Sequence, residues 1–397
     1  MAEPTSGSAV SSASKILTPE FLTLSVSASL FFGAMGALNP VLPKFISEEL
    51  GGSTVVVGVA VGSFALISLC VRPTLGRLGD RHGARLLLVI GCLAGVVGML
   101  ALLLARSPAA AIAARLPHGF AQAAMMTGST TLAMDLAPAH RRGEAASYIL
   151  VAFHLGLALG PLLGETARAR WGYDVVWVAA AVSMAAGAAS AGFLPHRRRE
   201  RSGPPSGLLH PAGVVPGAIM GLGMMGFVAV SSFVALYAKE IGVERVAPVF
   251  LLNSMVIALV RITAGRLPDR LGPVRSTSVA CGLAASGSLI VAIWHAPAGL
   301  YSGVALLSAG AALMTPSLVP VAVQNVPEHR RASALATFSM FMDVSVAITG
   351  PLFGLIASQV GYRGVFIAGA TAAAGALVLV RTMLARKVAS WGEPTTT

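Results

Sequence analysis

Charged residues are scarce in this sequence of 397 residues. Asp, Glu, Lys and Arg make up 11% of it, whereas ordinary globular domains contain roughly 25%. Apolar residues make up 55%, and the mean hydropathy is +0.78. Because so little charge cannot cover a surface that faces water, the composition excludes an ordinary soluble protein. It indicates that lipid surrounds most of the chain.

Cysteine is also rare, and a nucleotide-binding loop is missing. Cys70, Cys92 and Cys281 lie in or beside apolar runs, and their spacing matches neither a metal site nor a disulfide framework. We interpret them as small packing residues. The pattern G-x-x-x-x-G-K-[ST] does not occur, so ATP hydrolysis within this chain cannot drive a process. We therefore expect no metal, no cofactor, no catalytic residues and no enzyme activity.

The excess of basic residues has two possible meanings. A net charge of +12 could indicate nucleic-acid binding, but the basic residues form short clusters between apolar runs, and we expect no nucleic-acid partner. The 24 Arg against 4 Lys are typical of a GC-rich bacterial genome.

The polar N-terminal segment carries no pattern of a cleavable signal, so we expect none.

Long apolar runs fill most of the chain. A membrane span needs about 20 mostly apolar residues, and twelve segments qualify. The sequence therefore predicts an all-α integral membrane protein with twelve transmembrane helices. They are expected at 20–43, 52–71, 86–105, 109–134, 144–166, 172–195, 212–238, 246–264, 276–294, 297–323, 332–358 and 363–385.

The distribution of Arg and Lys predicts the orientation. With both termini in the cytoplasm, 20 of these residues fall on the cytoplasmic side and 7 on the outer side, as the positive-inside rule requires. The basic segment 196–211 reads as a cytoplasmic linker between a six-helix bundle at 1–195 and a second at 212–397. We expect a multi-pass protein of the bacterial cytoplasmic membrane, acting as a monomer.

A twelve-residue stretch occurs twice, each time between two apolar runs. Residues 72–83 read RPTLGRLGDRHG and residues 261–272 read RITAGRLPDRLG, which are identical at eight of twelve positions with an offset of 261 − 72 = 189. Two further pairs repeat at nearly the same offset: PAHRR at 138–142 with PEHRR at 327–331, and GPLLG at 160–164 with GPLFG at 350–354. The repeats predict two pseudo-symmetric halves, with the twelve-residue motif as a cytoplasmic turn in each.

These motifs resemble those of the major facilitator superfamily, and the resemblance covers nearly the whole chain. It implies two six-helix halves around a central cavity. Two of its motifs resemble the branch of proton-coupled exporters of drugs and metabolites. One is Arg115 followed by Gly119 in the fourth helix. The other, in the fifth helix, is the antiporter-like pattern of Gly156, Gly160, Pro161 and Gly164, although Glu165 stands where the longer pattern has glycine.

The duplicated motif suggests a conformational latch. A carboxylate such as Asp80 can accept hydrogen bonds from the N-terminal amides of a neighbouring helix in one conformation and lose them in another, and the resemblance implies this role. Alternatively, the charges only anchor the helix ends at the headgroups. The latch residues are Gly76, Asp80, Arg81, Gly83 and Arg85 in the first copy, and Gly265, Asp269 and Arg270 in the second.

Few ionisable residues lie inside the spans, so each is a candidate for proton coupling or for the substrate cavity. Arg115, His118 and Gln122 share one face of the fourth helix through their i, i+3, i+7 spacing. His154 and Asp343 occupy equivalent positions in the two halves, since 343 − 154 = 189, and either could carry a proton. Arg115, His154 and Asp343 could each instead make a structural contact with a neighbouring helix or with backbone carbonyl groups.

Gly160–Pro161 and Gly350–Pro351 are expected kink sites that let helices move, although a purely structural kink is equally consistent.

The leading functional hypothesis is a secondary transporter that exports small amphipathic compounds in exchange for protons, so its partners would be a small molecule, protons and the bilayer. The alternative is a proton symporter that imports a polar metabolite. A membrane sensor is disfavoured because no segment is long enough for a signalling domain.

Overall fold

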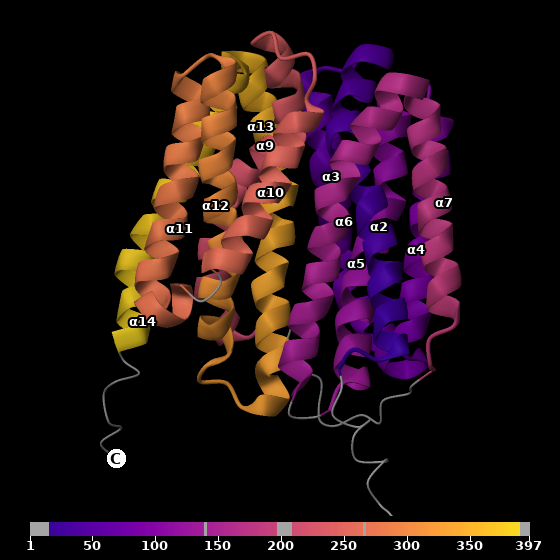
Figure 1. Cartoon of the computed structure of the whole chain (residues 1–397), viewed down its shortest axis with the longest axis vertical. Coiled ribbons are helices and arrows are strands. Elements are labelled where there is room, and N and C mark those ends of the chain that lie inside the picture. The colour runs from indigo at the N-terminus through magenta and orange to yellow at the C-terminus, as the bar shows by residue number, and fades with distance from the viewer. Residues whose placement is uncertain (1–15, 139–140, 197–208, 265–266, 390–397) are drawn as a thin grey trace, which may run out of the picture. The chain divides into compact units, whose positions relative to one another are not determined.

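The computed structural model describes residues 16–138, 141–196, 209–264 and 267–389, and all regular elements in those ranges are helices (Figure 1). This confirms the all-helical prediction. The elements are α2 (Pro19–Lys44), η1 (Phe45–Glu49), α3 (Thr54–His82), α4 (Ala84–Leu103), α5 (Pro108–Leu136), α6 (Arg142–Trp171), α7 (Tyr173–Gly192), α8 (Pro211–Gly223), α9 (Met225–Glu240), α10 (Ala247–Ala264), α11 (Leu267–Ile293), α12 (Pro297–Val323), α13 (Glu328–Leu379), η3 (Val380–Leu384) and α14 (Ala385–Ala389).

Within the described ranges, ten helical runs are long and apolar enough to cross a membrane. The run Ser333–Val388 has 56 residues, which at about 1.5 Å per residue exceeds twice the roughly 30 Å of a bilayer core. Its helix is interrupted at Gly361, where φ is 77°, so it is long enough for two spans. The helix α5 is not among the ten. The number twelve therefore stays a prediction.

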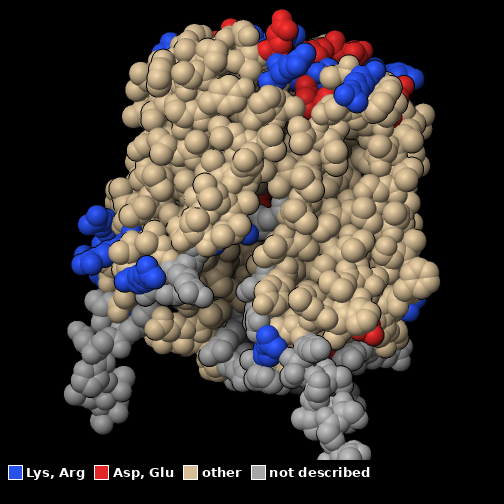
Figure 2. Space-filling view, in the orientation of Figure 1, with Lys and Arg blue, Asp and Glu red and all other residues tan. Residues whose placement is uncertain are grey.

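The outer surfaces of the helices are apolar. Large hydrophobic side chains such as Phe193 and Ile262 are more than four-fifths exposed, which a soluble protein rarely allows over a continuous surface. On the face shown in Figure 2, charged side chains gather near the helix ends and the sides between them are almost free of charge. These features are those of a multi-pass membrane protein.

The sequence repeat is matched by a repeat of backbone conformation. Gly83 (φ 79°, ψ 152°) and Gly272 (φ 77°, ψ 164°) interrupt the two copies of the duplicated motif, with 272 − 83 = 189. Gly172 (φ 83°, ψ −177°) and Gly361 (φ 77°, ψ 177°) form a second pair, with 361 − 172 = 189. Glycine populates this region readily and other residues do not. Positions that are 189 residues apart therefore turn in the same way at these two places.

The duplicated motif is mostly helical, which differs from the turn that the sequence suggested. The helix α3 continues through the first copy to His82. Leu75 is 1% exposed and packs in a small core with Leu87, Ala123 and Ala124. Burial of this leucine stabilises the extra turns of helix, so the chain reverses only at Gly83.

The chain divides into two compact units. The first comprises Met1–Leu38, Cys70–Ala105 and Leu116–Ser202, and the second comprises Asn39–Leu69, Arg106–Arg115 and Gly203–Thr397. The second unit thus includes the first half of α3 and the start of α5. The division into bundles at 1–195 and 212–397 stays a prediction.

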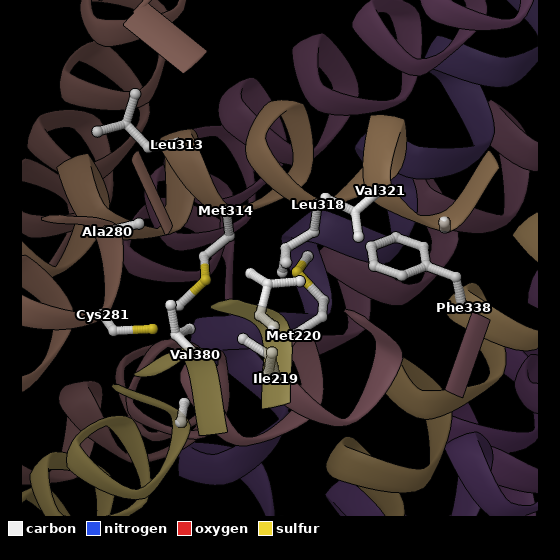
Figure 3. Packing of buried hydrophobic residues seen from close by; sticks show 13 residues of the cluster. Ile219, Met220, Ala280, Cys281, Leu313, Met314, Leu318, Val321, Phe338 and Val380 are labelled. Carbon is white, nitrogen blue, oxygen red and sulfur yellow. The ribbon is translucent and has the colours of Figure 1, made fainter. Parts of the chain in front are cut away.

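The second unit has an apolar core of side chains from five elements. Met314 of α12 extends toward Cys281 of α11 and Val380 of η3, and Met220 of α8 belongs to the same cluster (Figure 3). All four are at most 1% exposed. Phe338 of α13 belongs to the same cluster. These contacts hold α8, α11, α12, α13 and η3 together.

Candidate functional site

Asp343 is buried on the side of α13 that faces α3. It is 5% exposed, and the hydroxyl of Ser68, which is fully buried, donates a hydrogen bond of 3.4 Å to its Oδ2. A charge inside a bilayer costs about 2.5–3.5 kcal/mol on insertion scales. A carboxyl group placed here is therefore sensitive to any change in how α3 and α13 pack.

The helices α3 and α13 approach each other closely through glycines. Gly58 and Gly350 lie opposite each other, and neither leaves room for a Cβ atom. A Cβ on Gly62 would lie 2.6 Å from Pro351 Cδ, and a Cβ on Gly354 would lie 3.1 Å from Gly58 Cα. Small residues allow such contacts between helices in membranes. We refer to these five residues as the glycine seam, and Asp343 lies beyond one end of it.

Arg115 contacts the same helix α3. It is 4% exposed, its Nε donates a hydrogen bond of 3.3 Å to the carbonyl oxygen of Ala60, and its Cζ lies 4.3 Å from the ring centroid of Phe64. The cation–π contact offsets part of the cost of burial. Its Nη1 is buried with no hydrogen-bond partner within the described residues.

The contacts of Arg115 and Asp343 fall on one stripe of α3. Ala60, Phe64 and Ser68 are spaced by four residues and therefore lie along one side of the helix. Two side chains that the sequence suggested separately are thus brought to one helix by the structure. The segment of α3 from Ala60 to Ser68 is the centre of the candidate site.

The other candidates on α5 and α6 are placed differently. His118 is fully buried and packs against α4, where a Cβ on Gly98 would lie 2.7 Å from its Nε2. Its described neighbour is therefore α4, whereas that of Arg115 is α3. Gln122 is half-buried. The side chain of His154 lies outside the described part of the structure.

The antiporter-like motif of α6 packs against α2. A Cβ on Gly156 would lie 2.6 Å from the carbonyl oxygen of Ser29, and a Cβ on Gly164 would lie 2.7 Å from that of Ala37. Between them, Gly160 lies against Gly33 with no room for a Cβ, and Pro161 is close to Gly36. The two Gly–Pro pairs therefore have different partners, α2 for Gly160–Pro161 and α3 for Gly350–Pro351.

The latch residues lie at a helix end. Asp80 and Arg81 are exposed and Arg85 is half-buried. The Asp80 carboxylate makes no hydrogen bond or ion pair with any residue described. No atom lies within 4 Å of a Cβ placed on Gly76. In the second copy Arg270 is exposed, whereas Gly265 and the side chain of Asp269 lie outside the described residues.

Sequence reasoning did not find an ion pair at another helix end. The Lys239 Nζ, near the end of α9, lies 2.8 Å from Glu48 Oε1 in η1. These two residues are 191 positions apart in the sequence, and no local pattern around either one predicts the contact. No group of three or more His, Cys, Asp or Glu residues placed to hold a metal occurs in the described ranges.

Comparisons with known proteins are consistent with this architecture. The family model of the Major Facilitator Superfamily matches residues 24–308 and 296–396. An uncharacterized MFS-type transporter of Salmonella typhimurium is 30% identical over 373 residues, which are 89% of this chain and 94% of that protein. The crystal structure of the human organic anion transporter MFSD10 has a TM-score of 0.72 at 19% identity, and the match covers 91% of this chain and 100% of that one. For the nucleoside transporter NupG the TM-score is 0.73 at 14% identity, with 92% and 99% covered. At these identities the two structures show a likeness of fold alone.

Proposed function

Because the chain belongs to the major facilitator superfamily, we propose that it exports small amphipathic compounds in exchange for protons. Its family and relatives are those of secondary transporters, so its activity is transport. Direction, coupling ion and substrate class form our proposal. In it, the protein works by alternating access in the bacterial cytoplasmic membrane, with both termini inside.

The observation that carries the proposal is the burial of Asp343 beside Ser68 at the contact of α3 with α13. Repacking of this contact would change the solvation of the carboxyl group, and with it the free energy of binding a proton. By linkage, binding a proton would then favour one packing over the other. This coupling is what a proton-driven transporter requires.

The buried charge of Arg115 supports the same proposal. It contacts α3 eight and four residues before Ser68, at Ala60 and Phe64. A rearrangement of α3 would therefore change the surroundings of both charges together. In our proposal Asp343 carries the proton and Arg115 senses the same movement of α3.

The polar groups of residues 212–397 bear on whether the transported compound is amphipathic or polar. The hydroxyls of Ser231 and Ser302 donate to carbonyl oxygens of their own helices, and the hydroxyl of Tyr237 donates to Val291 O at 2.8 Å. Ser308 donates to Val304 O and to Asn253 Oδ1. A site for a polar metabolite should leave several such groups free. The hydroxyls of Ser317 and Thr349 are buried without a partner among the described residues, so import of a polar metabolite by proton symport stays the alternative.

Compound profiling tests the proposal. The protein should be expressed in a bacterial host that lacks its major efflux pumps, and the accumulation of diverse amphipathic compounds should be measured. We expect lower accumulation and higher resistance for a subset of compounds, and both effects should disappear when a proton uncoupler is added. Higher accumulation of a polar compound, abolished by the uncoupler, would instead favour import.

Asp80→Asn should shift the conformational equilibrium. The exposed Asp80 carboxylate is not engaged here, so in our proposal it binds helix amides in the other conformation. Contacts of this kind contribute about 0.3–1 kcal/mol. Loss of the Asp80 contact should therefore shift the equilibrium between the two conformations about two- to fivefold toward the packing described here. Maleimide labelling of a Ser68→Cys variant, made in a Cys70→Ser background, should slow by that factor because position 68 is buried in this packing.

The exposed Asp174 provides the matched control, since Asp174→Asn removes the same charge at a different helix end. Its labelling rate should equal that of the parent. An Asp80→Asn protein that is labelled as fast as the parent would show that Asp80 only anchors the helix end.

A further inference from the structure

An open hollow of about 400 Å³ lies beside the end of α11 that follows the duplicated motif. This volume is within the range of roughly 300–1,000 Å³ that small-molecule sites occupy. The hollow is formed by one side of α11 together with the π-helical turn η3. Its lining residues are Leu271, Val274, Arg275, Ser278, Val279 and Arg381.

Two cationic side chains line this hollow. Arg275 and Arg381 are exposed, and neither makes a hydrogen bond or ion pair with any residue in the described part of the chain. The segments Arg270–Ile293 and Val380–Ala389 contain no Asp or Glu. Basic side chains gather at this end of the second unit, near α14 (Figure 2). The two guanidinium groups are therefore available to an anionic ligand.

Apart from Ser278, whose hydroxyl donates to Val274 O, the rest of the lining is apolar and continues onto exposed apolar surface. Leu271 and Val279 are 37% and 42% exposed. Val378 and Met383, on either side of Arg381 in the sequence, are 60% and 49% exposed. A free phosphate ion gains nothing from such a lining, whereas an acyl chain does.

We propose that this hollow binds an anionic phospholipid. Arg275 and Arg381 bind the phosphate of the headgroup, for which guanidinium geometry is well suited, and the acyl chains lie along Val274 and Val279. Basic pockets between transmembrane helices are suited to anionic headgroups. The two arginines make the site selective for lipid charge, and the apolar lining makes it selective for lipid over free anions. This site is separate from Asp343 and Arg115 and does not depend on the direction of transport.

Native mass spectrometry of the purified full-length protein tests the site. Phosphatidylglycerol and phosphatidylcholine with the same acyl chains should be titrated separately. We expect phosphatidylglycerol to bind on the order of tenfold more tightly, because each arginine near a headgroup contributes about 1 kcal/mol. The double substitution Arg275→Gln, Arg381→Gln should remove this preference, because it should weaken the binding of phosphatidylglycerol more than that of phosphatidylcholine.

Arg386→Gln is the matched control, because Arg386 is exposed at the same helix end but does not line the hollow. It should keep the preference, and an equal loss would show diffuse attraction instead of a site. Val279→Trp fills the hollow and keeps both arginines, so it should weaken phosphatidylglycerol binding without a change of charge. Unchanged binding in that variant, or displacement of the lipid by excess inorganic phosphate, would overturn the proposal.

Discussion

Asp343→Asn should abolish proton-driven transport, with gradient-dependent efflux reduced to the level of empty vesicles. Asparagine keeps the size of the side chain and its ability to accept a hydrogen bond from Ser68, but it cannot exchange a proton. The folded protein should remain in the membrane. Exchange of labelled for unlabelled compound across vesicles without a proton gradient should persist, because this exchange requires no net movement of protons.

Two control variants separate the loss of the buried carboxyl group from the loss of any aspartate and from the loss of its hydrogen bond. Asp174→Asn changes an exposed aspartate and should transport normally. Ser68→Ala removes the 3.4 Å hydrogen bond but keeps the carboxyl group, so it should retain transport with a shifted pH dependence. Full gradient-driven transport by Asp343→Asn would show that the buried carboxyl is only a structural contact.

Gly350→Ala should destabilise the protein by about 1–3 kcal/mol, the usual cost of inserting a methyl group into a closely packed contact. The new Cβ would lie 2.5 Å from the carbonyl oxygen of Gly58, so α3 and α13 would have to separate. In a Cys70→Ser background, which removes the exposed thiol, thermal unfolding can be followed by the reaction of a thiol-specific dye with the buried Cys92 and Cys281. The transition should shift to lower temperature by several degrees.

Gly375→Ala is the control within the same helix α13, because no atom lies within 4 Å of a Cβ at that position. Alanine forms helix better than glycine by about 1 kcal/mol, so this variant should be as stable as the parent or more stable. If Gly350→Ala unfolds at the same temperature as Gly375→Ala, the glycine seam does not hold the two helices together.

The sequence predicted the membrane class and the duplication because both depend on local composition and spacing. The offset of 189 between 72–83 and 261–272 reappears in the paired glycines Gly83 and Gly272. The turn was predicted too early, because the sequence does not show that Leu75 is buried and that its burial extends the helix. Gly361 lies at the expected break between two predicted helices.

The site was predicted only in part. Arg115 and Asp343 could be singled out as candidates because charge is rare inside apolar runs, a property visible in sequence. Their partners Phe64 and Ser68 carry no signal of their own, since the contacts depend on how three helices pack. The spacing of Arg115 and His118 suggested one face, but their described neighbours are α3 for Arg115 and α4 for His118.

The central claim is that a proton moves opposite to the exported compound. Its most direct test uses proteoliposomes that contain a pH-sensitive dye, with the membrane potential held at zero and no initial pH gradient. The compound with the largest effect in accumulation assays is added outside. We expect the interior to become more alkaline as the compound enters and protons leave, and we expect no change with Asp343→Asn. Acidification of the interior by the wild-type protein, or entry of the compound without proton movement, would contradict it.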